Sequence, residues 1–235
     1  MYIEKTIRAG NIIIKKKYFS LRYGKKNIPR STNIHESSEQ QKRINKKRSD
    51  EKRTLLMLNN FNAGDWWITL TYSRDKRPKD IDEAHSIFRK FLQKVKRRLK
   101  KRGIEFKYMG KTEMPESGAV HHHLVINGDI EISEIFDMWE YGNLKDVKRI
   151  YKLDDFKLAN YFVKGENNRH KESDCRYTQS RNLLKPDEKV RIIKAGHWRR
   201  DPRPIKGYDI LSGSVQNFYD DVGFEMQKYI MVKRC

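Results

Sequence analysis

Three consecutive histidines, His121-His122-His123, open a short apolar run that ends at Asn127-Gly128. Apolar and β-branched runs bounded by Asn-Gly are typical of strands, and successive side chains of a strand point to opposite faces. His121 and His123 therefore share one face, about 7 Å apart along the strand, while His122 points to the other. Two imidazoles so placed suit ligands that converge on one ion. They also suit two half-buried histidines bonded to neighbours, so a metal site needs a third ligand.

A carboxylate on the preceding strand is the candidate third ligand. Residues 106–113 predict a strand that ends at Glu113, and the turn signal at residues 115–118 leads the chain back into the histidine strand. The hairpin brings Glu113 near His121 or His123 on a shared face. Mixed imidazole and carboxylate ligands suit Mn²⁺ or Mg²⁺ in an open site, and ligand type alone leaves zinc open.

The composition predicts a polyanionic partner. The 235 residues contain 52 Lys and Arg against 31 Asp and Glu, a formal net charge of +21, and residues 1–60 alone carry 16 basic and 5 acidic side chains. Nucleic acid is the default partner for such a chain, and an anionic membrane surface is the rival. No apolar run approaches the ~20 residues that span a bilayer, and a secretory signal is lacking. We expect a soluble, cytoplasmic protein that does not bind membranes.

The pattern of elements predicts an α+β fold. Residues 66–72 are aromatic and β-branched and predict a central strand. A helix capped by Asp80 and ended by Gly103 carries apolar residues at helical spacing and should pack on the sheet. Residues 1–36 predict a basic arm with a small strand. We expect further helices at residues 38–60, 131–151 and 154–164, and late strands at residues 214–219 and 224–232, the last one at a sheet edge.

Tyr161 and Lys164 could supply a nucleophile and a cation. They are three residues apart on the helix predicted for residues 154–164 and therefore lie on one face of it. A tyrosine on an amphipathic helix is ordinarily a core or interface residue, so its chemistry depends on what else surrounds it.

The order of these elements resembles the motifs of the HUH endonuclease superfamily of replication initiators, relaxases and transposases. The matching features are the strand at residues 68–71, the His-x-His strand and the helix with Tyr161-x-x-Lys164. The resemblance covers residues 65–165 and is most similar to the single-tyrosine rolling-circle replication initiator (Rep) proteins. One departure is His122, where an aliphatic residue is usual. The positions one turn either side of Tyr161 are not tyrosines, so the two-tyrosine motif is absent.

The resemblance implies a fold and a set of roles. The fold is an antiparallel β-sheet with helices packed on one face (an HUH, ferredoxin-like nuclease domain), here with a basic N-terminal arm and helix. Tyr161 would be the nucleophile and Lys164 its basic partner. His121, His123 and Glu113 would hold the divalent cation, Mn²⁺ or Mg²⁺.

The implied function is a metal-dependent single-strand DNA endonuclease and strand transferase that nicks a replication origin. It would act through a 5′-phosphotyrosine intermediate and so initiate rolling-circle replication. Its partners would be single-stranded or hairpin origin DNA and a host helicase. Lys107, Lys111, Arg97 and Arg98 are the candidate DNA-binding residues. A non-catalytic nucleic-acid-binding protein and a relaxase or transposase of the same superfamily stay open as alternatives.

Three segments follow from these patterns. Residues 1–62 should form the basic N-terminal arm and helix, and residues 63–170 the nuclease core. Residues 171–235 should form a C-terminal extension that packs on the core. Two scattered cysteines, Cys175 and Cys235, are too few for a disulfide framework or a Cys-x-x-Cys zinc site.

Overall fold

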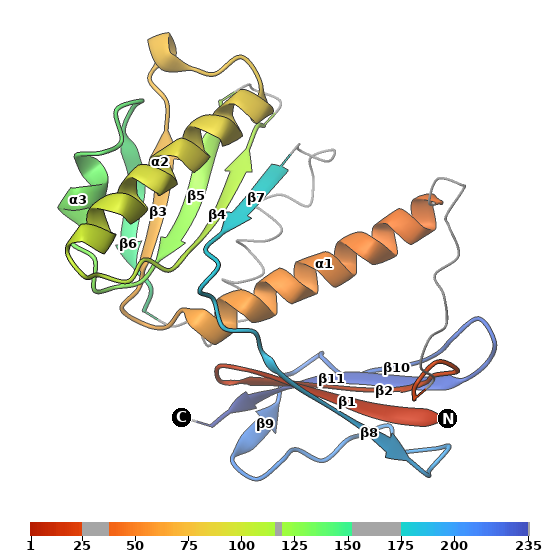
Figure 1. Ribbon diagram of the computed structural model, residues 1–235. Coiled ribbons are helices and arrows are strands. Elements are labelled where there is room, and N and C mark those ends of the chain that lie inside the picture. The colour runs from red at the N-terminus through yellow and green to blue at the C-terminus, as the bar shows by residue number, and fades with distance from the viewer. Residues whose placement is uncertain (25–37, 116–118, 152–174, 235) are drawn as a thin grey trace. The chain divides into compact units, whose positions relative to one another are not determined.

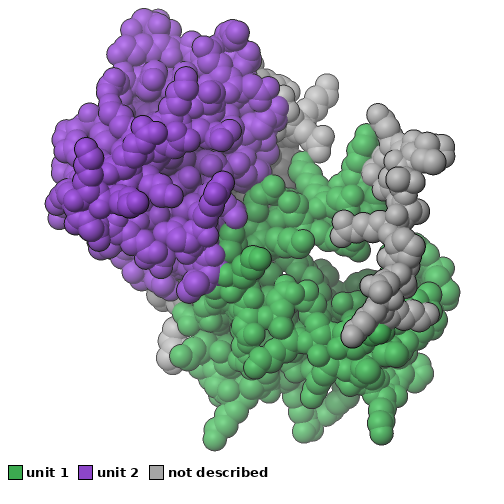
Figure 2. Space-filling view, in the orientation of Figure 1, with its two compact units in different colours: residues 1–59, 185–235 green, residues 60–184 purple. Residues whose placement is uncertain are grey.

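The chain divides into two compact units in the computed structural model (Figures 1 and 2). Unit 2 comprises residues 60–184, and unit 1 comprises residues 1–59 together with residues 185–235. Unit 2 is thus an uninterrupted stretch of chain placed between the two parts of unit 1. The structure describes residues 1–24, 38–115, 119–151 and 175–234.

Unit 2 contains five strands and three helical segments among its described residues. They are β3 (Trp66–Thr71), η1 (Arg74–Lys76), α2 (Ile81–Lys101), β4 (Tyr108–Glu113), β5 (His121–Ile126), α3 (Ile132–Phe136), β6 (Leu144–Arg149) and β7 (Cys175–Gln179). The strands form one sheet in the order β6-β3-β5-β4-β7, and every neighbouring pair is antiparallel. The histidine strand is therefore the middle strand.

Helix α2 begins and ends where the sequence predicted. The Asp80 side chain accepts a hydrogen bond from the backbone N–H of Glu83, and this cap satisfies one of the free donors of the first turn. Gly103 follows the helix with a φ of +73°, a left-handed conformation that glycine adopts without strain. The apolar side of α2 is buried in the core of unit 2, and Figure 1 shows the helix lying along the sheet.

The contact between α2 and the sheet is closest at Phe88. Its ring stacks on the His122 ring with centroids 4.3 Å apart and planes 10° apart. Gly110, on the neighbouring strand, leaves room for this ring: a Cβ there would lie 2.5 Å from Phe88. Phe88 and His122 are both fully buried. The helix can therefore approach the sheet this closely only because position 110 lacks a side chain.

The prediction of one helix over residues 131–151 was wrong. Only α3 is helical there, and the chain then returns as β6, which pairs with β3 at the edge of the sheet. A Cβ at Gly142 would overlap the Thr71 carbonyl and the Ser73 amide nitrogen, so the chain can pass this close to β3 only with glycine. Trp139 is buried and donates its indole N–H to the same carbonyl, 2.9 Å away. The apolar spacing reflected this packing and not a continuous helix.

The two chain ends of unit 2 are tied together by one side chain. The Asn60 amide donates to the Leu184 carbonyl at 2.8 Å and accepts from the Leu184 N–H at 2.7 Å. Unit 2 therefore starts and finishes at neighbouring points.

Unit 1 is a second antiparallel sheet with one long helix. Its described elements are β1 (Tyr2–Ala9), β2 (Ile12–Phe19), α1 (Glu39–Asn60, of which the last residue opens unit 2), β8 (Asp187–Ile193), β9 (Tyr208–Ile210), β10 (Gln216–Tyr219) and β11 (Glu225–Lys233). The strand order is β10-β11-β2-β1-β8, and β9 pairs with β11. Strands from both ends of the sequence thus complete a single sheet.

Helix α1 is fixed to this sheet by its C-terminal half. Thr54, Leu55, Met57 and Leu58 are buried. Glu51 forms ion pairs with a lysine of β2, Lys16, and with a lysine of β11, Lys228. Burial lowers the pKa of Lys16, an effect that the bond to Glu51 opposes. The predicted helix over residues 38–60 is confirmed, and the Ser38 hydroxyl accepts from the Gln41 N–H at its start.

The sequence missed most of this second sheet. Residues 1–36 were expected to hold one small strand and instead contribute the full hairpin of β1 and β2. The prediction that residues 224–232 form an edge strand was wrong, because β11 pairs with β2 on one side and with β10 and β9 on the other.

The expected fold class is confirmed: the molecule is α+β, with antiparallel sheets and few helices. Its sheets number two in the described ranges, where the sequence predicted one. None of the helices in those ranges has the length and apolar character needed to cross a lipid bilayer.

Replacing Gly110 by alanine should destabilise unit 2 by about 1–3 kcal/mol, because the new methyl group would overpack the core against Phe88. Thermal unfolding of the full chain measures the loss. Gly196→Ala is the control, since its Cβ would make only an ordinary contact, 3.8 Å from Tyr2. Equal stability of the two variants would contradict this account of the packing.

Candidate metal centre

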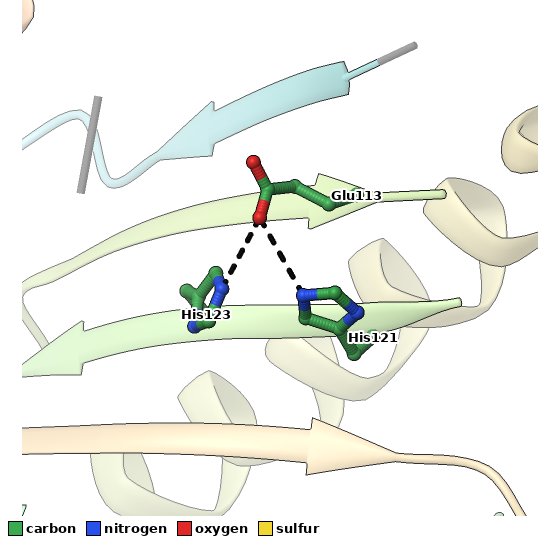
Figure 3. A group of neighbouring side chains, drawn as sticks. All are labelled: Glu113, His121 and His123. Carbon is green, nitrogen blue, oxygen red and sulfur yellow. Dashed lines mark ion pairs between the residues drawn. The ribbon is translucent and has the colours of Figure 1, made fainter. Parts of the chain in front are cut away.

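Three side chains converge on the face of the unit 2 sheet that lies away from α2. Glu113 comes from β4, and His121 and His123 come from β5 (Figure 3). Glu113 pairs in register with His121, so the hairpin itself sets the carboxylate beside the imidazoles. The Glu113 Oε2 atom lies 3.5 Å from Nε2 of His121 and 3.2 Å from Nε2 of His123. One ligand atom from each residue lies within 4.8 Å of the others, and the group could hold a metal ion.

The two histidines present the same nitrogen to this group. Nδ1 of His121 lies 3.1 Å from the Ala119 carbonyl oxygen, which can only accept, so Nδ1 carries the proton. Nδ1 of His123 lies 3.3 Å from the Thr69 hydroxyl. An outer hydrogen bond of this kind fixes the ring and leaves Nε2 with a free lone pair in the neutral form. Both Nε2 atoms face Glu113, as ligands of one ion must.

The charges of the group are strongly coupled. Burial raises the pKa of Glu113, but hydrogen bonds from His121, His123 and Lys111 outweigh it and hold this pKa well below its usual range. Burial lowers the pKa of His121, and its bonds to Glu113 and the Ala119 carbonyl outweigh burial and raise it. The carboxylate is therefore ionised at neutral pH and attracts positive charge. A divalent cation supplies that charge in place of the imidazole protons.

The donor set and its spacing fit a divalent ion with an open coordination sphere. Ligands about 2.1 Å from an octahedral ion are roughly 3 Å apart when they occupy adjacent positions. The distances of 3.2 and 3.5 Å from Glu113 to the two histidines are close to this value. Three protein ligands leave the remaining positions for water or substrate. The side chains of His121, His123 and Glu113 are 26%, 13% and 12% exposed, so solvent reaches the group.

The middle histidine has a different role. His122 is fully buried, and its Nε2 and Nδ1 atoms lie 2.9 Å from the hydroxyls of Tyr72 and Thr112. His85 contacts the same Thr112 hydroxyl at 3.2 Å. Burial lowers the pKa of His122 well below its usual value, so the ring is neutral. The sequence placed His122 on the core side, and that placement is confirmed.

The predicted DNA-binding residues are in unlike surroundings. Arg97 and Arg98 are exposed on α2, and Arg98 lies 3.6 Å from Glu134. Lys107 is partly exposed and lies 3.5 Å from Glu105. Lys111 is only 2% exposed and forms an ion pair with Glu113. Its position makes Lys111 part of the metal centre's charge balance.

Tyr161 and Lys164, the predicted nucleophile and its partner, lie outside the described residues. Their roles stay predictions.

Three neighbours of the group were missed by the sequence. Thr69 contacts His123, the Trp67 ring lies 5.8 Å from the His123 ring, and Lys111 neutralises Glu113. The alternation of β3 did place Thr69 and Trp67 on one polar face, but only the strand order shows that this face belongs to the histidine sheet. Lys111 and Glu113, two apart on one strand, carried the signal for their pairing.

Comparison with known proteins identifies this part of the chain. Residues 65–168 match the family model of the replication-associated protein ORF2 family. The matched segment is less than half of the chain and contains the metal centre, Tyr161 and Lys164. The recognition of a replication-associated protein is therefore confirmed at the level of this family. The family supports replication initiation as the role and DNA as the partner. No curated protein and no solved structure matches the chain.

Loss of either imidazole should weaken Mn²⁺ binding at least tenfold, because each removes one of three protein ligands. Isothermal titration of Mn²⁺ into His121→Ala and His123→Ala measures this, and circular dichroism checks that both variants fold. His197→Ala is the matched control, since His197 is 92% exposed on unit 1. Unchanged Mn²⁺ affinity in His121→Ala would remove that residue from the site.

Proposed function

We propose that this protein is a metal-dependent single-strand DNA endonuclease and strand transferase that initiates rolling-circle replication. The observation that carries the proposal is the convergence of His121, His123 and Glu113 on one sheet face, inside the segment that matches a replication-associated family. The net charge of +21 supports a nucleic-acid substrate.

Tyr161 is the proposed nucleophile. Its phenol oxygen forms a bond to the phosphorus of the scissile phosphodiester, and the bond from phosphorus to the 3′ oxygen breaks. The phenolic proton passes to solvent, and the departing oxygen takes up a proton to become a free 3′-OH. The strand remains attached to the enzyme through a 5′-phosphotyrosine. One phosphodiester replaces another, so rejoining requires no ATP.

Electrostatic help is needed because a tyrosine of pKa about 10 is mostly protonated at neutral pH. Lys164, three residues along from Tyr161, would favour the phenolate. A Mn²⁺ or Mg²⁺ ion held by His121, His123 and Glu113 would neutralise charge at the non-bridging phosphate oxygens. The ionised Glu113 and its neighbour Lys111 prepare that position for a cation of fixed geometry.

The substrate would be single-stranded or hairpin origin DNA. The exposed basic residues Arg97 and Arg98 and the partly exposed Lys107 are the proposed contacts to its backbone. A host helicase is the proposed partner, because nicking by itself opens no duplex. The free 3′-OH would then prime synthesis.

Tyr161→Phe should abolish the covalent adduct, because phenylalanine has no nucleophilic oxygen. Single-stranded origin DNA, Mn²⁺ and protein are mixed and the product is resolved by denaturing electrophoresis. Tyr151→Phe is the control, since Tyr151 is 84% exposed and outside the proposed mechanism. A retained adduct in Tyr161→Phe would exclude this residue as nucleophile.

The polarity of the adduct is a second test. DNA labelled on the 3′ side of the nick should become attached to the protein, because the 5′ phosphate is transferred. DNA labelled on the 5′ side should be released with a free 3′-OH that a polymerase extends. Attachment of the 5′-side label instead would contradict the proposed chemistry, as would an adduct that forms fully in EDTA.

A further inference from the structure

The N-terminal half of α1 is exposed along its whole length. Every residue from 39 to 48 is exposed, including Ile44 at 36%, whereas the buried residues of the helix begin at Thr54. Most helices in proteins are stabilised by burying one face. This half is helical because it extends a helix fixed at its other end. About ten residues, or roughly 15 Å of helix, therefore present their side chains to solvent.

The exposed half carries a basic side. Lys42, Arg43, Lys46 and Lys47 recur at positions i, i+1, i+4 and i+5 and so share one side of the helix. Lys42 and Lys46, like Arg43 and Lys47, are like-charged neighbours one turn apart, which destabilises a helix. The one acidic residue of the ten, Glu39, lies 3.1 Å from Lys42. A polyanion laid against this side would relieve the repulsion.

The basic side chains of the unit 1 sheet are placed differently. Glu51 pairs with Lys16 and Lys228, and the buried Glu4 pairs with Lys15 and Arg191. There the positive charge is balanced inside the fold. On the N-terminal half of α1 the basic residues outnumber the acidic ones and are exposed.

We propose that residues 39–48 of α1 dock in the major groove of duplex DNA. A helix with its side chains is about 10–12 Å across, and the major groove is about 12 Å wide. The segment contains Arg, Lys, Asn and Gln, whose side chains contact phosphates and base edges. It contains no aromatic residue on which an unpaired base could stack, which favours duplex over single-stranded DNA. The proposed surface belongs to unit 1, whereas the metal centre belongs to unit 2.

Binding is measured with a 24-base-pair duplex and with a single strand of the same length, both in EDTA so that no cleavage occurs. Arg43→Gln/Lys47→Gln should lower duplex affinity at 0.15 M salt at least tenfold. The slope of log K against log salt should fall by about 1.8, because each lost phosphate contact removes about 0.9. Lys206→Gln/Lys233→Gln removes the same charge from exposed positions of unit 1 off the helix and should bind as the unchanged protein does.

A second pair of variants separates the helix from its charge. Ile44→Pro keeps every charge but breaks the exposed helix, and Ile44→Ala preserves it. Ile44→Pro should lose duplex binding as the double variant does, while Ile44→Ala keeps it, with thermal unfolding unchanged in both. Equal binding by the two Ile44 variants would overturn the proposal, as would unchanged binding by the double variant or an equal loss on the single strand. Each outcome is independent of nicking.

Discussion

The register of the β4–β5 hairpin is the constraint on which the site depends. Pairing of Glu113 with His121 sets three donor atoms on one face of the sheet. A slip of one residue would turn the histidines toward the core and bring His122 to the surface. The opposite face prevents that slip, because His122 is stacked under Phe88 and bonded to Tyr72 and Thr112. Packing on one side of the sheet thus secures the chemistry on the other.

The run of three histidines shows how environment separates identical side chains. The middle ring is surrounded by core residues and hydroxyls and stays neutral, so it serves structure alone. Its two neighbours meet an ionised carboxylate and a buried lysine on the solvent side. The spacing of two along a strand is enough to produce this division. A substitution of the middle residue would therefore act on stability first and on the metal centre through it.

Sequence patterns predicted the local features of unit 2 well. The alternation in residues 121–126, the cap at Asp80 and the hairpin that brings Glu113 to the histidines are all set by short-range rules. Patterns failed where pairing joins distant segments. The strand at residues 144–149 is an edge strand of short polar composition, and β8 and β11 pair with β1 and β2 across nearly the whole chain. Nothing local in those residues indicates a partner so far away. The role of Lys111 was missed for a related reason, because a lysine on a strand is expected at the surface until its neighbours are known.

The amide of Asn60 clasps the two points where the chain enters and leaves residues 60–184. A stretch whose ends adjoin can be spliced into a surface turn of a host without stretching either one. The same adjacency means that the sheet of unit 1 must be assembled from halves separated by the whole inserted module. Genetic exchange could therefore pair one cutting module with different flanking segments, and so with different DNA specificities, while leaving its internal hydrogen bonding intact.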